Sequence, residues 1–129
     1  MPESIIPAYA YSHEFVVPEA AIDALGHANN VEYLRWAQDV AGAHWQSVCP
    51  PAEREKYVWV VREHHIKYRH PAYAGEVLRA TTWVGDTHGA TSVRHTRLTR
   101  AADAVLLCEA ETTWVLLDPG NGRPVRVEA

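Results

Sequence analysis

The chain has 129 residues, of which 47% are hydrophobic, and its 12 basic and 16 acidic residues give a formal net charge of −4 at pH 7. This length predicts a single domain over residues 1–129, and the hydrophobic fraction excludes a disordered chain. The sequence shows no apolar run of membrane-spanning length, no secretory leader and no CxxC pair, so a cytoplasmic location is expected.

Charge is distributed unevenly along the chain. Residues 1–34 contain no Lys or Arg, whereas residues 54–100 hold nine basic and four acidic residues. The pI near 6 argues against a duplex-DNA binder, which needs a strongly basic face, so no nucleic-acid partner is predicted. A local basic stretch of this kind suits a small phosphorylated ligand.

The first half of the chain predicts one strand and one helix. Alternation over residues 13–17 predicts a short strand, and a polar, Gly-containing turn follows at 23–29. Apolar residues then recur every three or four positions over residues 30–48, which predicts a helix capped by one of the two asparagines at its start and ended by the two prolines after it. Gly42 costs about 1 kcal/mol of helix propensity, which favours a close backbone contact at that position.

The second half predicts only strands, over residues 57–69, 77–86, 90–100 and 105–118. The last three are joined by short turns and therefore form an antiparallel meander. A Pro-Gly-Asn-Gly turn then leads to a short tail at 125–127.

Alternating residues identify the buried face of this sheet. In the strand 77–86 the shared face carries Leu78, Ala80, Thr82 and Val84. In the strand 105–118 it carries Leu106, Cys108, Ala110, Thr112, Trp114 and Leu116. The opposite face of the last strand carries acidic residues and cannot form a second core. The order β-α-β-β-β-β therefore predicts an α+β fold in which the helix covers one face of a single antiparallel sheet.

The segment with the clearest chemistry has the pattern D-x-x-G-H-x-N-N-x-x-Y, from Asp23 to Tyr33. It brings a carboxylate, an imidazole and two amides into a turn that opens onto a helix N-terminus, where unpaired N–H groups stabilise negative charge. Acyl transfer needs such donors for an oxyanion, with a carboxylate nearby as nucleophile or general base. The alternative is structural, because Asp and Asn before a helix commonly form turns and caps.

This segment resembles the signature of hotdog-fold acyl-CoA thioesterases of the 4-hydroxybenzoyl-CoA thioesterase type. Residues 66–76 resemble the family's I-x-Y-x-x-P-A-x-x-G-D segment, with Glu76 in place of the Asp, and residues 122–124 resemble its C-terminal G-R-P. The resemblance covers about residues 11–127 in the same element order. It implies a hotdog fold, in which one long helix is wrapped by a five-stranded antiparallel sheet.

The resemblance also implies a function and roles for individual residues. The reaction would be hydrolysis of an acyl-CoA to a carboxylic acid and free coenzyme A, with no cofactor beyond the CoA of the substrate. Asp23 would attack the thioester or activate a water, and His27 would orient the reacting groups or have a structural role. The N–H groups of Asn30 and Val31 would bind the carbonyl oxygen. The candidates for substrate binding are Gly26, Asn29, Tyr33, Glu63 and His64.

Basic side chains of the strands are candidates for contacts with the phosphates of CoA. These are Arg62, Arg69, Arg94 and Arg100. Cross-strand ion pairs with Glu109 and Glu111 are the alternative explanation, and pairing is favoured for Arg97. Among the eight histidines, His64 and His65 are adjacent on a strand and point to opposite faces, so no metal site is predicted.

A single sheet leaves an edge and a face open, which a second subunit would cover. The resemblance implies a homodimer with active sites at its interface, often assembled into a tetramer. The five tryptophans are expected mainly in the core or in subunit contacts, with one or two at most lining an acyl tunnel. The alternative function is a non-catalytic hotdog protein that binds acyl-CoA or acyl-carrier protein, and the presence of Asp23 favours the enzyme.

Overall fold

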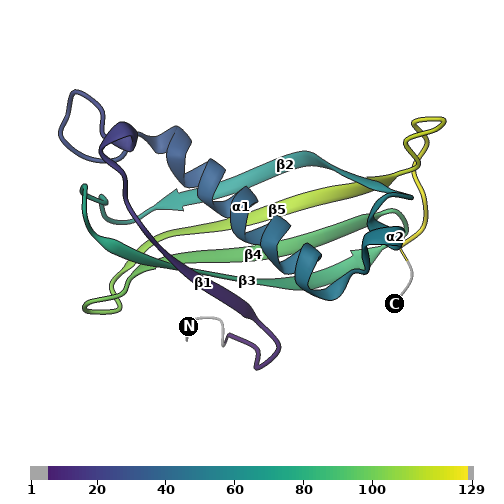
Figure 1. The fold of residues 1–129 in the computed structure, drawn as a ribbon, viewed down its shortest axis with the longest axis horizontal. Helices are drawn as coiled ribbons and strands as arrows, with labels where there is room; N and C mark the ends of the chain where they lie inside the picture. The colour runs from purple at the N-terminus through teal and green to yellow at the C-terminus, as the bar shows by residue number, and fades with distance from the viewer. Residues whose placement is uncertain (1–5, 128–129) are drawn as a thin grey trace.

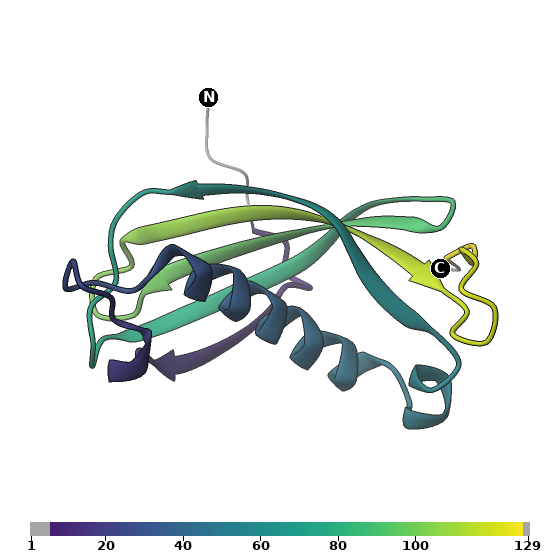
Figure 2. The same ribbon diagram turned by 90° about the horizontal axis from the view of Figure 1, so that it is seen from above.

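The computed structural model describes residues 6–127 and contains one long helix, α1 (Asn30–Val48), on one face of a five-stranded sheet. The strands are β1 (Tyr11–Val16), β2 (Val58–Tyr68), β3 (Val77–His88), β4 (Thr91–Arg100) and β5 (Leu106–Leu117). A short 3-10 turn, η1 (Glu19–Ala21), precedes α1, and a one-turn helix, α2 (Pro51–Arg54), follows it. Figures 1 and 2 show α1 lying along the concave face of the sheet. The predicted α+β architecture and its β-α-β-β-β-β order are confirmed.

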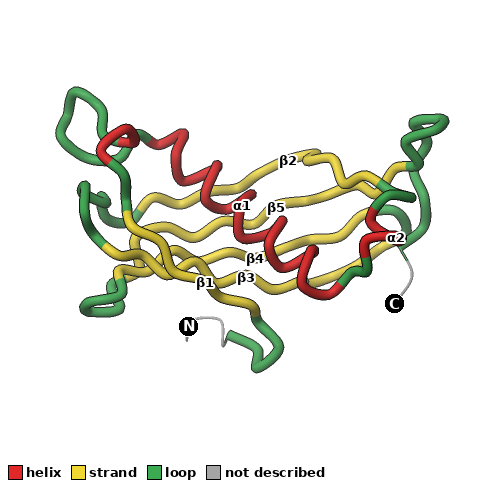
Figure 3. Tube along the Cα trace, in the orientation of Figure 1, coloured by secondary structure: helices red, strands yellow, loops and turns green. Residues whose placement is uncertain are grey.

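The strands lie in the order β1-β3-β4-β5-β2, and every neighbouring pair is antiparallel. The meander of β3, β4 and β5 forms the middle of the sheet, while β1 and β2 form its edges (Figure 3). β2 pairs only with β5 within the described chain, so its second edge has unpaired backbone groups that can pair with another strand.

The core lies between α1 and the concave face of the sheet. α1 buries one stripe of side chains, as its three- and four-residue spacing predicts: Tyr33, Trp36, Ala37, Val40 and Ala41. On the sheet, Leu78 and Leu98 are fully buried beneath this stripe, and each such leucine contributes about 1.5–3 kcal/mol relative to an exposed one. The alternation predicted for β3 is confirmed at Leu78, Ala80 and Thr82, which are each 0% exposed.

The start of β5 departs from the predicted alternation. Leu107 is fully buried, while Leu106, which was expected on the buried face, is half-buried. The cause is a shift of register between β4 and β5 at Leu98 and Thr99. A bulge of this kind redirects side chains, and here the carbonyl of Leu107 also accepts hydrogen bonds from two consecutive N–H groups, at positions 69 and 70.

Two local expectations need correction, and the tail keeps the irregular form expected of it. The proline pair ends α1 as predicted, but Pro51 also begins α2, because proline suits the first position of a helix. The close contact expected at Gly42 is wrong, since a Cβ atom there would meet nothing within 4 Å. The tail at 125–127 forms no regular strand, although the N–H of Val127 donates to the carbonyl of Gly89.

Candidate functional site

The turn that carries Asp23 lies between η1 and α1 and is fixed by its own backbone. Ile22 and Ala28 form an isolated antiparallel bridge, and the N–H of Asp23 donates to the carbonyl of His27 at 3.1 Å. Within the turn, the N–H of Gly26 donates to the carbonyl of Asp23 at 3.0 Å. Gly26 has a φ of +87°, a left-handed conformation that favours glycine. The turn therefore presents the Asp23 side chain from a well-defined position.

The two carboxylate oxygens of Asp23 have different surroundings. Oδ1 accepts a hydrogen bond from the N–H of Leu25 at 2.9 Å, while Oδ2 is 3.5 Å from the Nδ2 of Asn29. The side chain is half-buried. One oxygen is thus held by the turn, and the other keeps lone pairs available for a reaction.

The N-terminus of α1 begins next to this carboxylate. Asn29 is its N-cap, and its Oδ1 accepts from the N–H of Val31 at 3.0 Å. The N–H of Asn30 is in the first turn and has no acceptor within the helix. Of the two N–H groups predicted to bind a carbonyl oxygen, that of Val31 is occupied by the cap. The Asn29 carboxamide also reaches Asp23, so one side chain links the carboxylate to the helix end.

The second family-like segment packs against the first. The N–H of Ala28 donates to the carbonyl of Ala72 at 2.8 Å, and the N–H of Ala72 donates to the hydroxyl of Tyr33 at 2.9 Å. Tyr33 is 3% exposed, and burial raises the pKa of its hydroxyl. Tyr33 is therefore placed in the core, where it anchors the loop after β2 to the start of α1. Tyr68, at the end of β2, adds a hydrogen bond to the carbonyl of Asn30 at 3.3 Å.

The other predicted site residues lie around this turn or on β2. The His27 ring packs edge-on against Tyr73, and its Nδ1 lies 3.3 Å from the carbonyl of Ala28. Within the described residues, no hydrogen bond joins this ring to the Asp23 carboxylate. On β2, His64 bonds through Nδ1 to the Thr112 hydroxyl at 2.8 Å, and burial lowers the pKa of His64. The adjacent Glu63 alternates to the outer face of the sheet.

The four arginines expected at the CoA phosphates lie in different places. Arg62 is exposed on β2, and Arg69 is exposed but lies 3.4 Å from a carboxylate oxygen of Glu109. Arg100 is held by Asp103 at 2.8 Å and by a second carboxylate, that of Glu76, at 3.5 Å.

Arg94 is placed beneath α1 rather than on the surface. It lies three residues before Arg97 in β4, and an odd separation puts two strand residues on opposite faces of the sheet. Arg97 lies opposite Glu109 on the outer face, with its guanidinium 5.8 Å from the ring centroid of Trp83.

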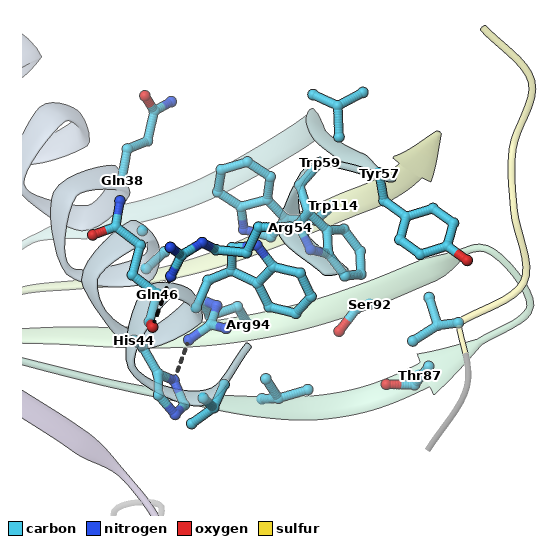
Figure 4. Close-up of a pocket in the computed structure, with 17 residues that line it drawn as sticks. Gln38, His44, Gln46, Arg54, Tyr57, Trp59, Thr87, Ser92, Arg94 and Trp114 are labelled. Carbon is cyan, nitrogen blue, oxygen red and sulfur yellow. Dashed lines mark hydrogen bonds between the residues drawn. The ribbon is translucent and has the colours of Figure 1, made fainter. Parts of the chain in front are cut away.

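A pocket of about 560 Å³ opens between the C-terminal half of α1 and the concave face of the sheet (Figure 4). Its walls include Trp45, Trp59 and Trp114, three of the five tryptophans. None of the residues predicted for catalysis lines it. At 1.5 Å per residue, Trp45 lies about 20 Å along α1 from Asn30, so the pocket and the Asp23 turn occupy opposite ends of the same helix.

Sequence reasoning missed this pocket, because its lining residues come from six separate parts of the chain. One signal was available. Arg94 shares its strand face with the buried Leu98, so alternation alone puts a charged side chain among core positions. A buried charge needs partners of its own and commonly marks a functional position.

Three further observations concern other kinds of chemistry. Within residues 6–127, no three or more His, Cys, Asp or Glu side chains come together as a metal site would require. No helix of the described chain has the length and hydropathy needed to cross a bilayer. Burial raises the pKa of Cys108 to about 12, so at neutral pH its thiol stays protonated and is not a nucleophile.

The helix wrapped by a five-stranded sheet, with a carboxylate turn at the helix N-terminus, defines the class of hotdog thioesterase-like proteins. Residues 16–129 match the family model of the thioesterase-like superfamily, and the chain belongs to that family. A search of curated protein sequences finds no significant match.

Several solved structures share the fold at low sequence identity. A 4-hydroxybenzoyl-CoA thioesterase variant in complex with 4-hydroxybenzoyl-CoA is 18% identical, with a TM-score of 0.86 over 95% of each chain. A protein of Staphylococcus aureus in complex with CoA is 20% identical, with a TM-score of 0.84 over 98% of this chain and 81% of that one. A 1,4-dihydroxy-2-naphthoyl-CoA thioesterase from Synechocystis is 15% identical, with a TM-score of 0.80 over 92% and 90%. These likenesses confirm the hotdog fold.

Proposed function

We propose that this protein hydrolyses acyl-CoA thioesters, and that the Asp23 carboxylate performs the chemistry at the N-terminus of α1. The observation that carries the proposal is the Asn29 carboxamide, which contacts the Asp23 carboxylate and caps the helix with the same side chain. A nucleophile or base is thereby held beside the positive end of a helix dipole, where a developing oxyanion is stabilised. Membership of the thioesterase-like superfamily and the structural likeness to thioesterases that act on CoA esters support the reaction type.

Two chemical routes start from this arrangement. In the first, an oxygen of Asp23 attacks the thioester carbon, the carbon–sulfur bond breaks, CoA leaves as a thiolate that takes a proton from water, and a second water hydrolyses the mixed anhydride. In the second, Asp23 takes a proton from a water, the resulting hydroxide adds to the carbonyl, and the proton passes to the departing sulfur. Oδ2, which has only a long contact to Asn29, is the oxygen suited to either role.

The neighbouring groups have supporting roles in this proposal. The carbonyl oxygen of the substrate accepts from the N–H of Asn30, and it shares or displaces the Asn29 cap to reach the N–H of Val31. His27, whose ring packs against Tyr73, orients the carbonyl group of the substrate or has a structural role in the turn. Gly26 supplies the left-handed turn, and Tyr33 holds the neighbouring loop.

The phosphates of CoA are proposed to contact the exposed arginines of the β2 segment. Arg62 and Arg69 extend from β2 and the residue after it, and both are open to solvent. Arg100 is committed to two carboxylates and Arg94 lies beneath α1, so these two are less suited to a surface phosphate. Glu63, on the outer face of β2 beside His65, and His64, bonded to Thr112, stay candidates for lining the substrate site from a second subunit.

We propose that the chain acts as one hotdog domain in a homodimer, which further assembles into a tetramer, in the cytoplasm. The open edge of β2 supports pairing with a second copy, because its backbone groups lack a neighbouring strand within the described chain. The two cysteines are unpaired, which suits a reducing compartment.

Thiol release from short, long and aromatic acyl-CoAs tests the proposal, with wild-type protein and with Asp23→Asn. The variant keeps the shape of the side chain and removes its basicity and nucleophilicity, so turnover of the best substrate is expected to fall roughly 100-fold or more. Glu19→Gln is the matched control, since it makes the same carboxyl-to-amide change on an exposed residue of η1 and should leave turnover unchanged.

Full activity in Asp23→Asn would overturn the role given to this residue. Absence of turnover on every thioester, together with measurable CoA-ester binding, would instead favour the alternative function of a non-catalytic protein that binds acyl-CoA or acyl-carrier protein.

A further inference from the structure

The pocket under the C-terminal half of α1 has an unusual charge composition. Its 17 lining residues include two arginines and a histidine, and no aspartate or glutamate. Arg54, at one side, donates to the carbonyls of Gln46 and Cys49 at 3.0 and 3.2 Å and so satisfies the C-terminal end of α1. Arg94 lies deeper, between α1 and the sheet. The interior of the pocket is therefore positive.

Arg94 is a cation with only neutral partners among the described residues. Its Nη1 donates to the Nδ1 of His44 at 2.9 Å and to the hydroxyl of Thr82 at 3.2 Å, and no described carboxylate forms an ion pair with it. Burial lowers the pKa of Arg94 to about 10, so the guanidinium is still charged at neutral pH. Desolvating a charge without a counter-ion is costly, and the cost is recovered when an anion binds.

The orientation of Arg94 leaves its carboxylate-binding edge available. Both hydrogen bonds use Nη1, so Nη2 and Nε keep N–H groups with the parallel geometry that a carboxylate accepts in bidentate fashion. His44 is held in place by stacking on Tyr11, with ring centroids 5.2 Å apart. The pKa of His44 is lowered by burial and by Arg94, which keeps the ring neutral and able to accept from the guanidinium. The two residues thus form a preorganised donor group (Figure 4).

The remaining walls of the pocket suit a ligand whose main part is apolar and flat. Trp45 and Trp59 meet edge to face with ring centroids 5.8 Å apart, and Trp114 lies nearby on β5. The Nε1 of Trp114 is buried and has no hydrogen-bond partner among the described residues. Unsatisfied buried donors of this kind are rare in folded proteins.

We propose that this pocket binds a carboxylate with an aromatic or otherwise apolar body, with its carboxylate on Arg94 and its body against the tryptophans that line the pocket. The inference stands apart from thioester hydrolysis, because it concerns binding at the other end of α1. The carboxylate has two possible sources: a free carboxylic acid, or the far end of an acyl group carried by a thioester. The ligand chemistry is the same in both.

Isothermal titration with 2-naphthoate and with 2-naphthamide tests the charge recognition directly. The two probes have the same body and differ only in the anion. The wild-type protein is expected to bind the acid at least about tenfold more tightly than the amide, and Arg94→Met is expected to abolish this preference while keeping an apolar chain in place. Arg79→Met is the matched control, since Arg79 is exposed on β3, paired with Glu14 and outside the pocket.

Equal affinity of the wild-type protein for acid and amide, or no binding of either, would overturn the proposal. So would an unchanged preference in a folded Arg94→Met variant. If this variant does not fold, the comparison of the two probes on the wild-type protein still decides. The source is identified separately by titration with hexadecanedioyl-CoA and hexadecanoyl-CoA, whose acyl chains are long enough to span the two ends of α1: a preference for the dioyl ester that Arg94→Met removes indicates the acyl end, and equal affinity for the two esters with acid binding intact indicates a free acid.

Discussion

The two ends of α1 differ in how they hold their polar groups. At the N-terminal end, polar atoms are linked to one another, since the turn, the cap and the Asp23 carboxylate form one chain of hydrogen bonds. At the C-terminal end, the half-buried guanidinium of Arg94 lies among neutral and aromatic side chains in an open pocket. The first arrangement is suited to fixing a reactive group, and the second is suited to recognising a ligand that brings the opposite charge.

The Asp23 turn and the pocket that holds Arg94 are separated by about 20 Å along the helix. Within one chain, a short acyl group whose thioester lies at Asp23 does not reach Arg94. A change at one end should therefore leave the function of the other end intact, since effects of well-separated sites are usually independent.

Removing the hydroxyl of Tyr33 is expected to have the largest effect on stability. Tyr33→Phe leaves the N–H of the fully buried Ala72 without its acceptor, which costs about 1–3 kcal/mol. The free energy of unfolding from urea titration measures the loss. Tyr68→Phe is a matched control at the more exposed neighbouring hydroxyl and should cost less. Equal stability of Tyr33→Phe and wild type would show that this hydroxyl does not anchor the N-terminal end.

Loss of the N-cap at Asn29 is expected to have the next largest effect on stability. Asn29→Ala removes the acceptor for the N–H of Val31 and should lower the free energy of unfolding by about 1 kcal/mol. Asn29→Ser retains a good cap without adding a charge beside Asp23 and should keep the wild-type stability, but it removes the amide donor to Asp23. Both variants should therefore lower turnover, while only the alanine lowers stability. Unchanged turnover in both variants would contradict the proposal that the Asn29 cap positions the Asp23 carboxylate.

At the other end of α1, Gly42→Ala should stabilise the protein by about 0.5–1 kcal/mol, because glycine is unfavourable inside a helix and the added Cβ meets nothing within 4 Å. Thermal unfolding measures the gain. Gly42 also lines the pocket, so the substitution tests whether carboxylate binding tolerates a methyl group at its wall. A loss of stability would show that the position is more crowded than it is in this structure.

The stability of the protein should depend on pH through two histidines. Burial lowers the pKa of His44 and His64 in the folded chain, so below pH 6.5 the unfolded state takes up protons more readily and stability falls. The decline ends once the pH is below the folded pKa of each ring. Urea titrations across this range should show a shallower decline in a His44→Gln, His64→Gln double variant. An identical pH dependence in the double variant and the wild type would show that these two rings do not cause the loss of stability.

Much of the fold was predictable, because the spacing of hydrophobic residues along the chain distinguishes the helix from the strands. The start of β5 was not, since a register shift that leaves Leu106 half-buried and buries Leu107 is not visible in the local alternation. The start of α2 was missed for a different reason: a proline that ends one helix also suits the first position of the next, and Pro51 does so here.

The candidate sites were predictable to different extents. The Asp23 turn is local, so its parts are adjacent in the sequence. The pocket is assembled from distant segments, and Arg94 was predicted to contact the phosphates of CoA, although its position in β4 places it on the concave face beneath α1. The side chains predicted to contact the phosphates are all arginines, and the face of the sheet toward which each one points determines whether it lies at the surface or in the pocket.

The most direct test compares Asp23→Asn and Arg94→Met in two assays, thiol release and titration with 2-naphthoate. The account predicts that Asp23→Asn lowers turnover roughly 100-fold or more and keeps the Kd for 2-naphthoate within about twofold, while Arg94→Met raises that Kd about tenfold or more. Full turnover in Asp23→Asn, or equal weakening of naphthoate binding by both variants, would contradict the division of roles between the two ends of α1.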